Sequence, residues 1–163
     1  MSITAARAMI VLGLVLVLGG VNYAIYGKER IVRNGETIFL ELAPVDPRSL
    51  MQGDYMALRF ALADAIERQR DVGAASRART APLAIDTRGV ATLRGGLDSG
   101  DDTGPVIAFR IRGGRVWLGT NAFFFSEGAA DRYAAARYGE FKLDRESGDA
   151  VLVGLRDAEL APL

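Results

Sequence analysis

The sequence predicts a mostly β protein: an antiparallel, β-rich domain with one or two short helices, preceded by a single N-terminal transmembrane helix. Three observations lead to this class. The 163-residue chain opens with a long apolar run, short apolar stretches recur through the remainder, and 19 glycines separate many of those stretches. Glycine between short apolar stretches is typical of strands joined by turns. A chain of this length favours one compact domain after the helix.

The apolar run begins at Ala8, and 14 uncharged, mostly aliphatic residues lead to Val21 before the run extends to Tyr26. As a helix, residues 8–26 span roughly 28 Å, close to the thickness of a bilayer's hydrocarbon core. Tyr23 and Tyr26 stand where interfacial aromatic residues are expected. A cleaved signal peptide has a shorter apolar core and a small-residue cleavage site, and no such site follows here. We therefore expect an uncleaved, single-pass anchor over residues 1–27 and an extramembrane domain over residues 28–163.

The charges that flank the helix bear on its orientation. Only Arg7 precedes the helix, whereas Lys28, Arg30 and Arg33 follow it. Counted strictly, the positive-inside rule places the C-terminal domain in the cytoplasm, but the rule is weakest when a long domain follows. The charge pattern by itself therefore leaves both orientations open.

Composition excludes several classes of function. The 20 basic and 20 acidic side chains leave no net charge, whereas nucleic-acid binding needs a clustered positive surface. The chain has no cysteine and no histidine, which removes disulfides, thiolate and imidazole metal sites, and the serine–histidine–acid triad. We expect no nucleic-acid partner and no cofactor. Any catalysis would depend on carboxylates, hydroxyls, arginine, or the two lysines, Lys28 and Lys142.

The clearest strand pair is a hairpin. Val106–Arg112 reaches Gly113-Gly114, two residues that suit the positive φ angles of a tight turn, and Arg115–Gly119 returns. This register places Arg110 opposite Trp117 on one face, where a cation–π contact is expected. The apolar face of the hairpin carries two further pairs, Ile111 with Val116 and Phe109 with Leu118.

Other strands and two helices are predicted from the same signals. Asp86–Gly89 and Asp144–Gly148 have the composition of hairpin loops. An alanine- and charge-rich helix is expected over Ala63–Ala75, and a short one over Ala129–Arg137 with Ser126 as its N-cap. The remaining strands are expected at Thr37–Leu42, Tyr55–Leu62, Leu83–Asp86, Val90–Leu93, Phe123–Phe125, Glu140–Leu143 and Val151–Leu155.

Two stretches resemble catalytic signatures but lack the partners that the chemistry needs. Residues 98–104 contain D-S-G and D-T-G, the tripeptides of aspartic proteases, yet the copies are too close together for one chain to form a facing dyad. The same aspartates lack the spacing of a calcium loop, so a solvated turn is favoured. Ser49–Asp54 after a membrane anchor is similar to the serine–lysine signal peptidases, but neither lysine occupies a convincing base position.

The densest polar motif joins two predicted strands. Asp46-Pro47 favours a turn in which the aspartate accepts hydrogen bonds from backbone amides, and Gly53 can supply a left-handed residue before the next strand. Asp46, Arg48, Asp54 and Tyr55 would then gather at one corner. A corner of this kind is either structural, with carboxylates satisfying amides and Arg48, or a recognition surface.

The same segment resembles a known family. Gly53-Asp54-Tyr55, Leu58 and Phe60 are similar to the motif of the bacterial GDYXXLXY protein family, with phenylalanine in place of its last tyrosine. Pro44–Arg48 and several stretches from Phe124 to Leu155 also resemble it, so the likeness covers nearly the whole chain. The resemblance implies a membrane-anchored bacterial protein, often encoded near multi-spanning membrane proteins. It also implies export, which places the domain in the periplasm and the anchor in the inner membrane.

We therefore expect a non-enzymatic, membrane-tethered module that binds an integral inner-membrane protein. Its surface would centre on Asp46, Arg48, Asp54 and Tyr55, with Glu127 and Arg137 brought nearby by the fold. Two alternatives stay open. One is a hydrolase that uses Asp46 and Asp54 as acid and base; the other is a small-ligand sensor in which Trp117 or residues 123–125 line a cavity, although core packing is favoured for those phenylalanines.

Overall fold

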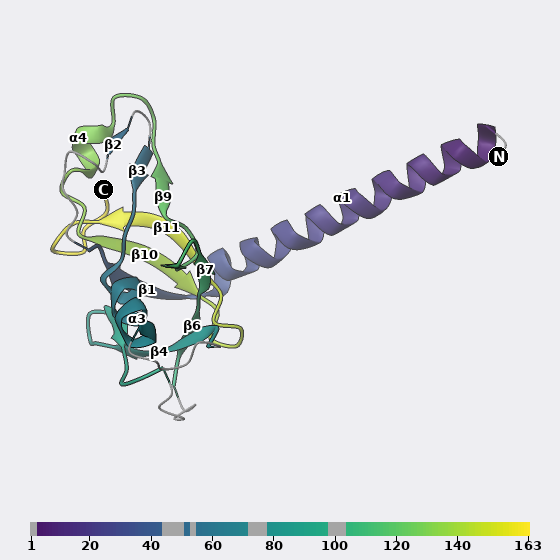
Figure 1. The fold of residues 1–163 in the computed structure, drawn as a ribbon. Coiled ribbons are helices and arrows are strands. Elements are labelled where there is room, and N and C mark those ends of the chain that lie inside the picture. Colours follow the sequence, from purple (N-terminus) through teal and green to yellow (C-terminus); the bar gives the residue numbers. More distant parts are fainter. Residues whose placement is uncertain (1–2, 44–50, 53–54, 72–77, 98–103) are drawn as a thin grey trace.

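A computed structural model of the protein describes residues 3–43, 51–52, 55–71, 78–97 and 104–163. Its first element, helix α1 (Ile3–Asn34), projects from a body built mainly of strands (Figure 1). From Met9 to Asn34 this helix is long and apolar enough to cross a membrane by length and composition, and its most apolar window is not buried by the body. The helix continues beyond residue 27, and near its end Ile31 is buried against the body.

The strands of the body form four small antiparallel sheets, as the sequence predicts for a mostly β protein. The described residues also contain two shorter helices, α3 (Ala61–Asp71) and α4 (Ala130–Tyr133). The first sheet has the order β1 (Glu36–Glu41), β10 (Tyr138–Leu143), β11 (Ala150–Arg156). The second has the order β2 (Met51–Gln52), β3 (Tyr55–Ala57), β9 (Ala122–Phe124). The third has the order β5 (Ala91–Leu93), β4 (Thr80–Ile85), β6 (Val106–Ala108), and the fourth pairs β7 (Arg110–Arg112) with β8 (Arg115–Trp117).

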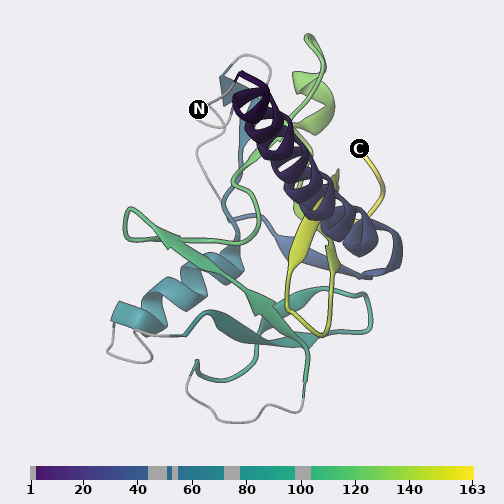
Figure 2. The same cartoon turned by 90° about the vertical axis from the view of Figure 1, so that its right-hand side faces the viewer.

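The sheet β1-β10-β11 supplies the centre of the core. Along β10 buried and half-buried residues alternate, as expected for a strand with one face on the core. Ile38 pairs with Phe141, and both side chains are fully buried. Helix α3 adds Leu62 and Ile66 to the same cluster, so the core lies between this sheet, α3 and the smaller sheets (Figure 2).

Most predicted strands are confirmed within one or two residues, and three differ. The strand predicted to start at Leu83 starts three residues earlier, at Thr80. The predicted strand Tyr55–Leu62 ends at Ala57, because the chain turns into α3 at Ala61. The predicted strand Val106–Arg112 is divided at Phe109, where the pairing partner changes from β4 to β8. Phe109 is buried and its amide donates to the carbonyl of Arg79, so the predicted pair of Phe109 with Leu118 is not part of the hairpin ladder.

The rest of the hairpin prediction is confirmed except for its cation–π contact. Gly113 and Gly114 have positive φ angles of 56° and 81°, and Ile111 pairs with Val116. Arg110 is opposite Trp117 in register, but it is the guanidinium of Arg112 that lies over the indole, 5.1 Å from its centroid. Long side chains reach diagonal neighbours on one face of a ladder, which explains the exchange.

Both predicted helices are found, with bounds that differ from the prediction, and the second is shorter, at Ala130–Tyr133. Helix α3 starts two residues before Ala63 and ends at Asp71, and residues 72–75 of the prediction lie outside the described residues. The prediction of Ser126 as an N-cap is wrong: the N-cap of α4 is Ala129, with no side-chain hydrogen bond. The carbonyl of Ser126 instead accepts from the amide of Ala129, so this segment forms a turn before the helix.

Gly139 lets two aromatic rings pack against the central sheet. A Cβ at this position would lie 2.9 Å from Cε1 of Phe60 and 3.0 Å from Cε2 of Phe141. Those rings meet edge to face with centroids 5.2 Å apart. Gly154, on the neighbouring strand, would bring its Cβ no closer than 3.6 Å to a flexible carboxylate oxygen of Glu140.

Replacing Gly139 with alanine should therefore destabilise the body. We expect Gly139→Ala to lower the free energy of unfolding by about 1–3 kcal/mol, the usual cost of overpacking a core. Gly154→Ala is the matched control and should leave stability within about 0.5 kcal/mol. Chemical denaturation of the full chain in detergent measures both, and equal effects of the two substitutions would contradict this packing.

An ion pair joins the first strand to the β10–β11 loop. The guanidinium of Arg145 donates two hydrogen bonds to the carboxylate of Glu36. This hydrogen bonding to Arg145 holds the pKa of Glu36 below its ordinary value. Because the pKa is lower in the folded state, the pair stabilises the fold above the ordinary pKa of the carboxyl and loses its contribution as the pH falls through the lowered value.

At neutral pH, Glu36→Gln should lower the free energy of unfolding by a few tenths to about 1 kcal/mol, the range for solvent-accessible pairs. The difference from the parent chain should shrink in acid, because Glu36 is then protonated in both states of the parent. Glu159→Gln, which removes an exposed carboxylate that has no ion pair within the described residues, is the control. A Glu36→Gln effect that persists unchanged at low pH would contradict the assignment.

Candidate functional site

The predicted corner is described only in part. Asp46, Arg48, Gly53 and Asp54 lie outside the described residues, as do Ser49 and residues 98–103 of the D-S-G and D-T-G stretch. Tyr55 is described and begins β3, where it pairs with Phe124 of β9. The hydrolase hypothesis, which requires Asp46 and Asp54 in one pocket, stays a prediction.

Tyr55 and Phe124 form an aromatic pair in which Tyr55 is half-buried and Phe124 is exposed. Their ring centroids are 5.8 Å apart, and Phe124 is 75% exposed. Strand alternation explains this exposure: Phe123 and Phe125 turn to the other side, where each contacts the ring of Tyr133. The prediction of core packing is thus confirmed for Phe123 and Phe125, which pack against the hydrophobic cluster, and is wrong for Phe124.

The other apolar residues of the motif lie in the core. Leu58 is 7% and Phe60 2% exposed. The amide of Leu58 donates to the carbonyl of Asn121, which connects the motif to β9, and Phe60 forms an isolated bridge with Leu42 at the end of β1. The Tyr-x-x-Leu-x-Phe spacing therefore presents one aromatic residue at the surface and anchors the following residues inside.

Glu127 and Arg137 occupy different places. Glu127 is exposed in the turn between β9 and α4, close in sequence to Phe124. Arg137 is exposed immediately before β10, and its carbonyl accepts from the amide of Leu42. Arg137 thus lies beside the last described residues before the Asp46 segment, where the chain leaves β1.

A groove of about 870 Å³ lies at the foot of α1, that is, beside its C-terminal part, where Lys28 lines it. Its apolar lining includes Trp117, Phe123 and Phe124, three of the residues proposed for a sensor cavity. Helix α3 positions the wall that carries Trp117, since the carboxylate of Glu67 accepts from the amide of Val116 at 2.7 Å. The charged lining comes from four elements or loops: Lys28, Arg79, Arg110, Arg112 and Asp149.

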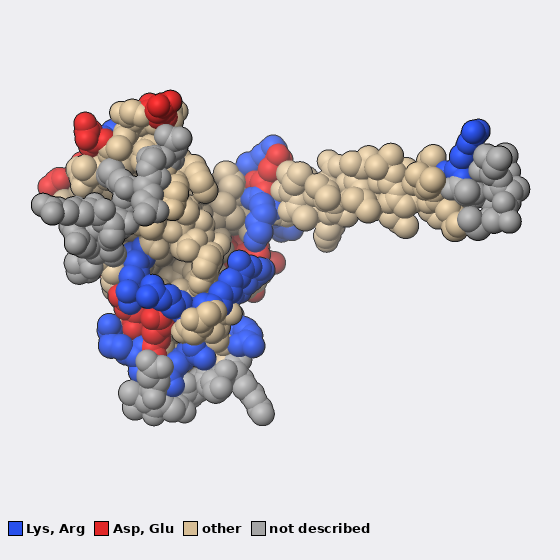
Figure 3. Space-filling view, turned by 45° about the horizontal axis from the view of Figure 1, so that its top comes forward, with Lys and Arg blue, Asp and Glu red and all other residues tan. Residues whose placement is uncertain are grey.

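The sequence analysis missed the charge of this groove. It treated Arg110 only as a partner for Trp117, yet Arg110 and Arg112 alternate along one strand of the hairpin and Arg115 is opposite Arg112 across the turn. Lysine and arginine side chains gather on the lower part of the body and around the end of α1, whereas most of the projecting helix is uncharged (Figure 3). The repeated arginines are the signal that could have predicted a cationic surface.

Neither lysine has the surroundings of a catalytic base. The amine of Lys28 forms an ion pair with Asp149 at 2.8 Å, and both side chains are about half exposed. The amine of Lys142 donates to the hydroxyl of Thr37 at 2.7 Å. Desolvation is what makes a lysine a base near neutral pH. Within the part of the chain that the structure describes, acidic side chains form no group of three that could hold a metal ion.

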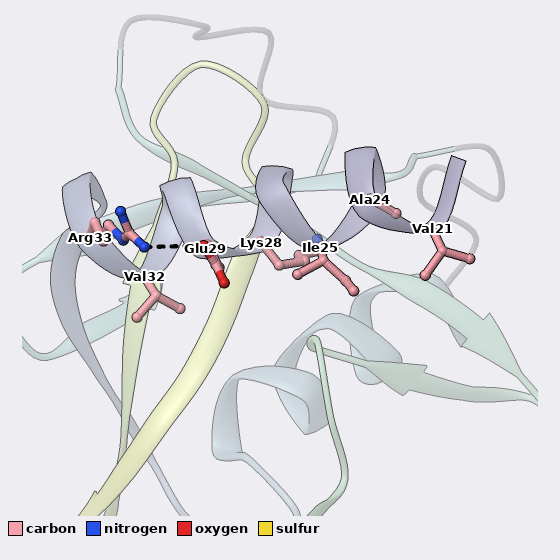
Figure 4. Close-up of a pocket in the computed structure, with 7 residues that line it drawn as sticks. All are labelled: Val21, Ala24, Ile25, Lys28, Glu29, Val32 and Arg33. Atoms are coloured by element: carbon pink, nitrogen blue, oxygen red, sulfur yellow. Dashed lines mark hydrogen bonds and ion pairs between the residues drawn. The ribbon is translucent and has the colours of Figure 1, made fainter. Parts of the chain in front are cut away.

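A second hollow, of about 670 Å³, follows the side of α1 itself. Val21, Ala24, Ile25 and Val32 line it, and the ion pair between Glu29 and Arg33 lies at its end (Figure 4). All of its lining comes from one helix, so it is an open helix face and encloses no volume by itself. This face passes from apolar to charged residues where α1 approaches the body.

A family model described as GDYXXLXY protein matches residues 17–155 of the chain. The chain belongs to the GDYXXLXY protein family. The match starts inside α1 and ends in β11, so it includes the second half of the apolar helix and almost the whole body. Comparison with curated proteins and with solved structures finds no match.

Proposed function

We propose that this GDYXXLXY protein is a non-enzymatic accessory module, tethered to the bacterial inner membrane by α1, that binds another integral-membrane protein through the surface around Tyr55 and Phe124. The observation that carries the proposal is the exposure of Phe124. Among the described residues after α1, only Phe124 and Val153 are large hydrophobic side chains that remain exposed.

The chemistry of this surface fits a protein partner. Aromatic residues are enriched at interfaces, and those that dominate affinity lie at the centre of a desolvated patch. Tyr55 packs beside Phe124 and limits the ring's freedom, so little conformational entropy is lost when a partner covers it. The polar residues of the motif precede Tyr55 directly in the chain and could supply the rim.

A tether favours a partner in the same membrane. A body held by α1 is confined to a thin layer beside the bilayer, which raises its effective concentration toward other membrane proteins. Weak contacts then suffice for binding. This argument supports the class of partner that the family resemblance implies.

A photo-crosslinking amino acid at position 124 tests the proposal in intact membranes. We expect it to capture one integral-membrane protein reproducibly, and we expect Tyr55→Ser in the same chain to reduce that product about tenfold or more, as loss of an interface anchor does. The same amino acid at exposed position 159 is the control and should not yield the product. Recovery of only lipid and abundant proteins at position 124 would argue against a protein partner.

The proposal places the body in the periplasm. Its support is the family resemblance, and the opposing charge count of Lys28, Arg30 and Arg33 against Arg7 is weak evidence when a long domain follows. A reporter enzyme that is active only after export, fused after Leu163, should be active in intact cells. The control is a reporter that matures only in the cytoplasm at the same position. Activity of the second reporter with silence of the first would place the body, and the search for its partner, in the cytoplasm.

A further inference from the structure

The groove at the foot of α1 carries more positive charge than its own carboxylate neutralises. Among the described residues, four cationic side chains and one carboxylate line it, and Lys28 uses that carboxylate, Asp149, in its ion pair. Arg79, Arg110 and Arg112 are exposed, and within the described residues none of the three forms an ion pair. Three guanidinium groups are thus left available to an anion.

Helix α1 sets the depth of this groove relative to a membrane. The apolar stretch that can fill the hydrocarbon core ends at Tyr26, and Lys28 follows two residues later. At about 1.5 Å per residue, Lys28 lies roughly 3 Å beyond that stretch, inside the headgroup layer. Because Lys28 itself lines the groove, the groove opens at the level of the lipid phosphates when α1 spans the bilayer.

The wall of the groove also lies on the side of the body that would face the membrane when α1 spans it. Figure 2 faces the side of the body from which α1 projects, and the hairpin of β7 and β8 crosses that side. Trp117, on β8, is half-buried and contacts Arg112. Tryptophan is enriched at membrane interfaces, where its ring is partly solvated and its N–H can donate a hydrogen bond.

We propose that this groove binds the phosphate of an anionic phospholipid headgroup in the membrane that α1 crosses, with Arg79, Arg110 and Arg112 as its ligands. Guanidinium groups donate paired hydrogen bonds that match phosphate oxygens. The aromatic floor suits the less polar part of the lipid below its phosphate. Phe124 lines this groove as well as the proposed protein-binding surface, whereas the three arginines belong to the groove.

Trp117 is the only tryptophan of the chain and reports on the groove directly. The full-length chain is placed in nanodiscs of phosphatidylcholine, either alone or mixed with phosphatidylglycerol, and quenching of its fluorescence by neutral acrylamide is measured. We expect quenching to be about twofold weaker in the anionic discs, because each basic residue near an anionic surface favours contact by about fivefold. High salt should remove the difference. Equal quenching in the two kinds of disc would overturn the proposal.

Charge-matched variants distinguish lipid binding in the groove from a general electrostatic attraction of the body to the membrane. The double substitution Arg79→Gln with Arg110→Gln should abolish the protection of Trp117 from acrylamide in anionic discs. The double substitution Arg79→Lys with Arg110→Lys should retain most of that protection. Arg112 is kept because it contacts the indole of Trp117. Arg68→Gln with Arg132→Gln removes the same charge from outside the groove lining and should leave the protection intact. Loss of protection in this control would overturn the assignment to the groove.

A final comparison distinguishes lipid from soluble anion. Inorganic phosphate added to the chain in phosphatidylcholine discs should give Trp117 no comparable protection, because the membrane presents its headgroups at far higher local concentration. Protection by inorganic phosphate equal to that of phosphatidylglycerol would show a site for a soluble anion and would overturn the lipid proposal.

Discussion

The pairing of β1 with β10 is the constraint on which the rest of the molecule depends. It runs from Glu36 opposite Leu143 to Glu41 opposite Tyr138, and so joins the start of the body to its last third. Strand β11 continues the sheet from β10. Long-range pairing of this kind carries a large loop-closure cost, which the burial of Ile38, Leu40 and Phe141 must offset.

This sheet also determines the direction in which α1 projects. A single residue, Gly35, separates α1 from β1, and a Cβ there would lie 2.5 Å from the carbonyl oxygen of Ile31. Ile31 is buried, and Lys28 pairs with Asp149 in the loop before β11. The last turns of α1 are therefore part of the body.

Two surfaces of different chemistry meet at Phe124. On one side Phe124 pairs with the half-buried Tyr55 that follows the polar motif, and on the other it lines the cationic groove beside α1. A chain with no net charge thus has a concentrated positive site, because its carboxylates are used elsewhere: Glu140 with Arg156, Glu36 with Arg145, and Asp64 with Arg59. Net charge describes the whole surface and says little about any one part of it.

The sequence alone was sufficient for the class of fold, the apolar helix, most strands and the Gly113-Gly114 turn, because these depend on local periodicity and on glycine's freedom at positive φ. It was also sufficient for family membership, through the residues around Tyr55. Only the tertiary structure decided that the predicted strands at Tyr55 and Val106 stop early, that Arg112 rather than Arg110 covers Trp117, and that Phe124 is exposed while Phe60 is buried. The tertiary structure also brings Arg79, Arg110 and Lys28 together in one groove. The physical reason is that the pairing of strands depends on the apolar surface buried by the whole chain, and a local sequence pattern does not contain this information.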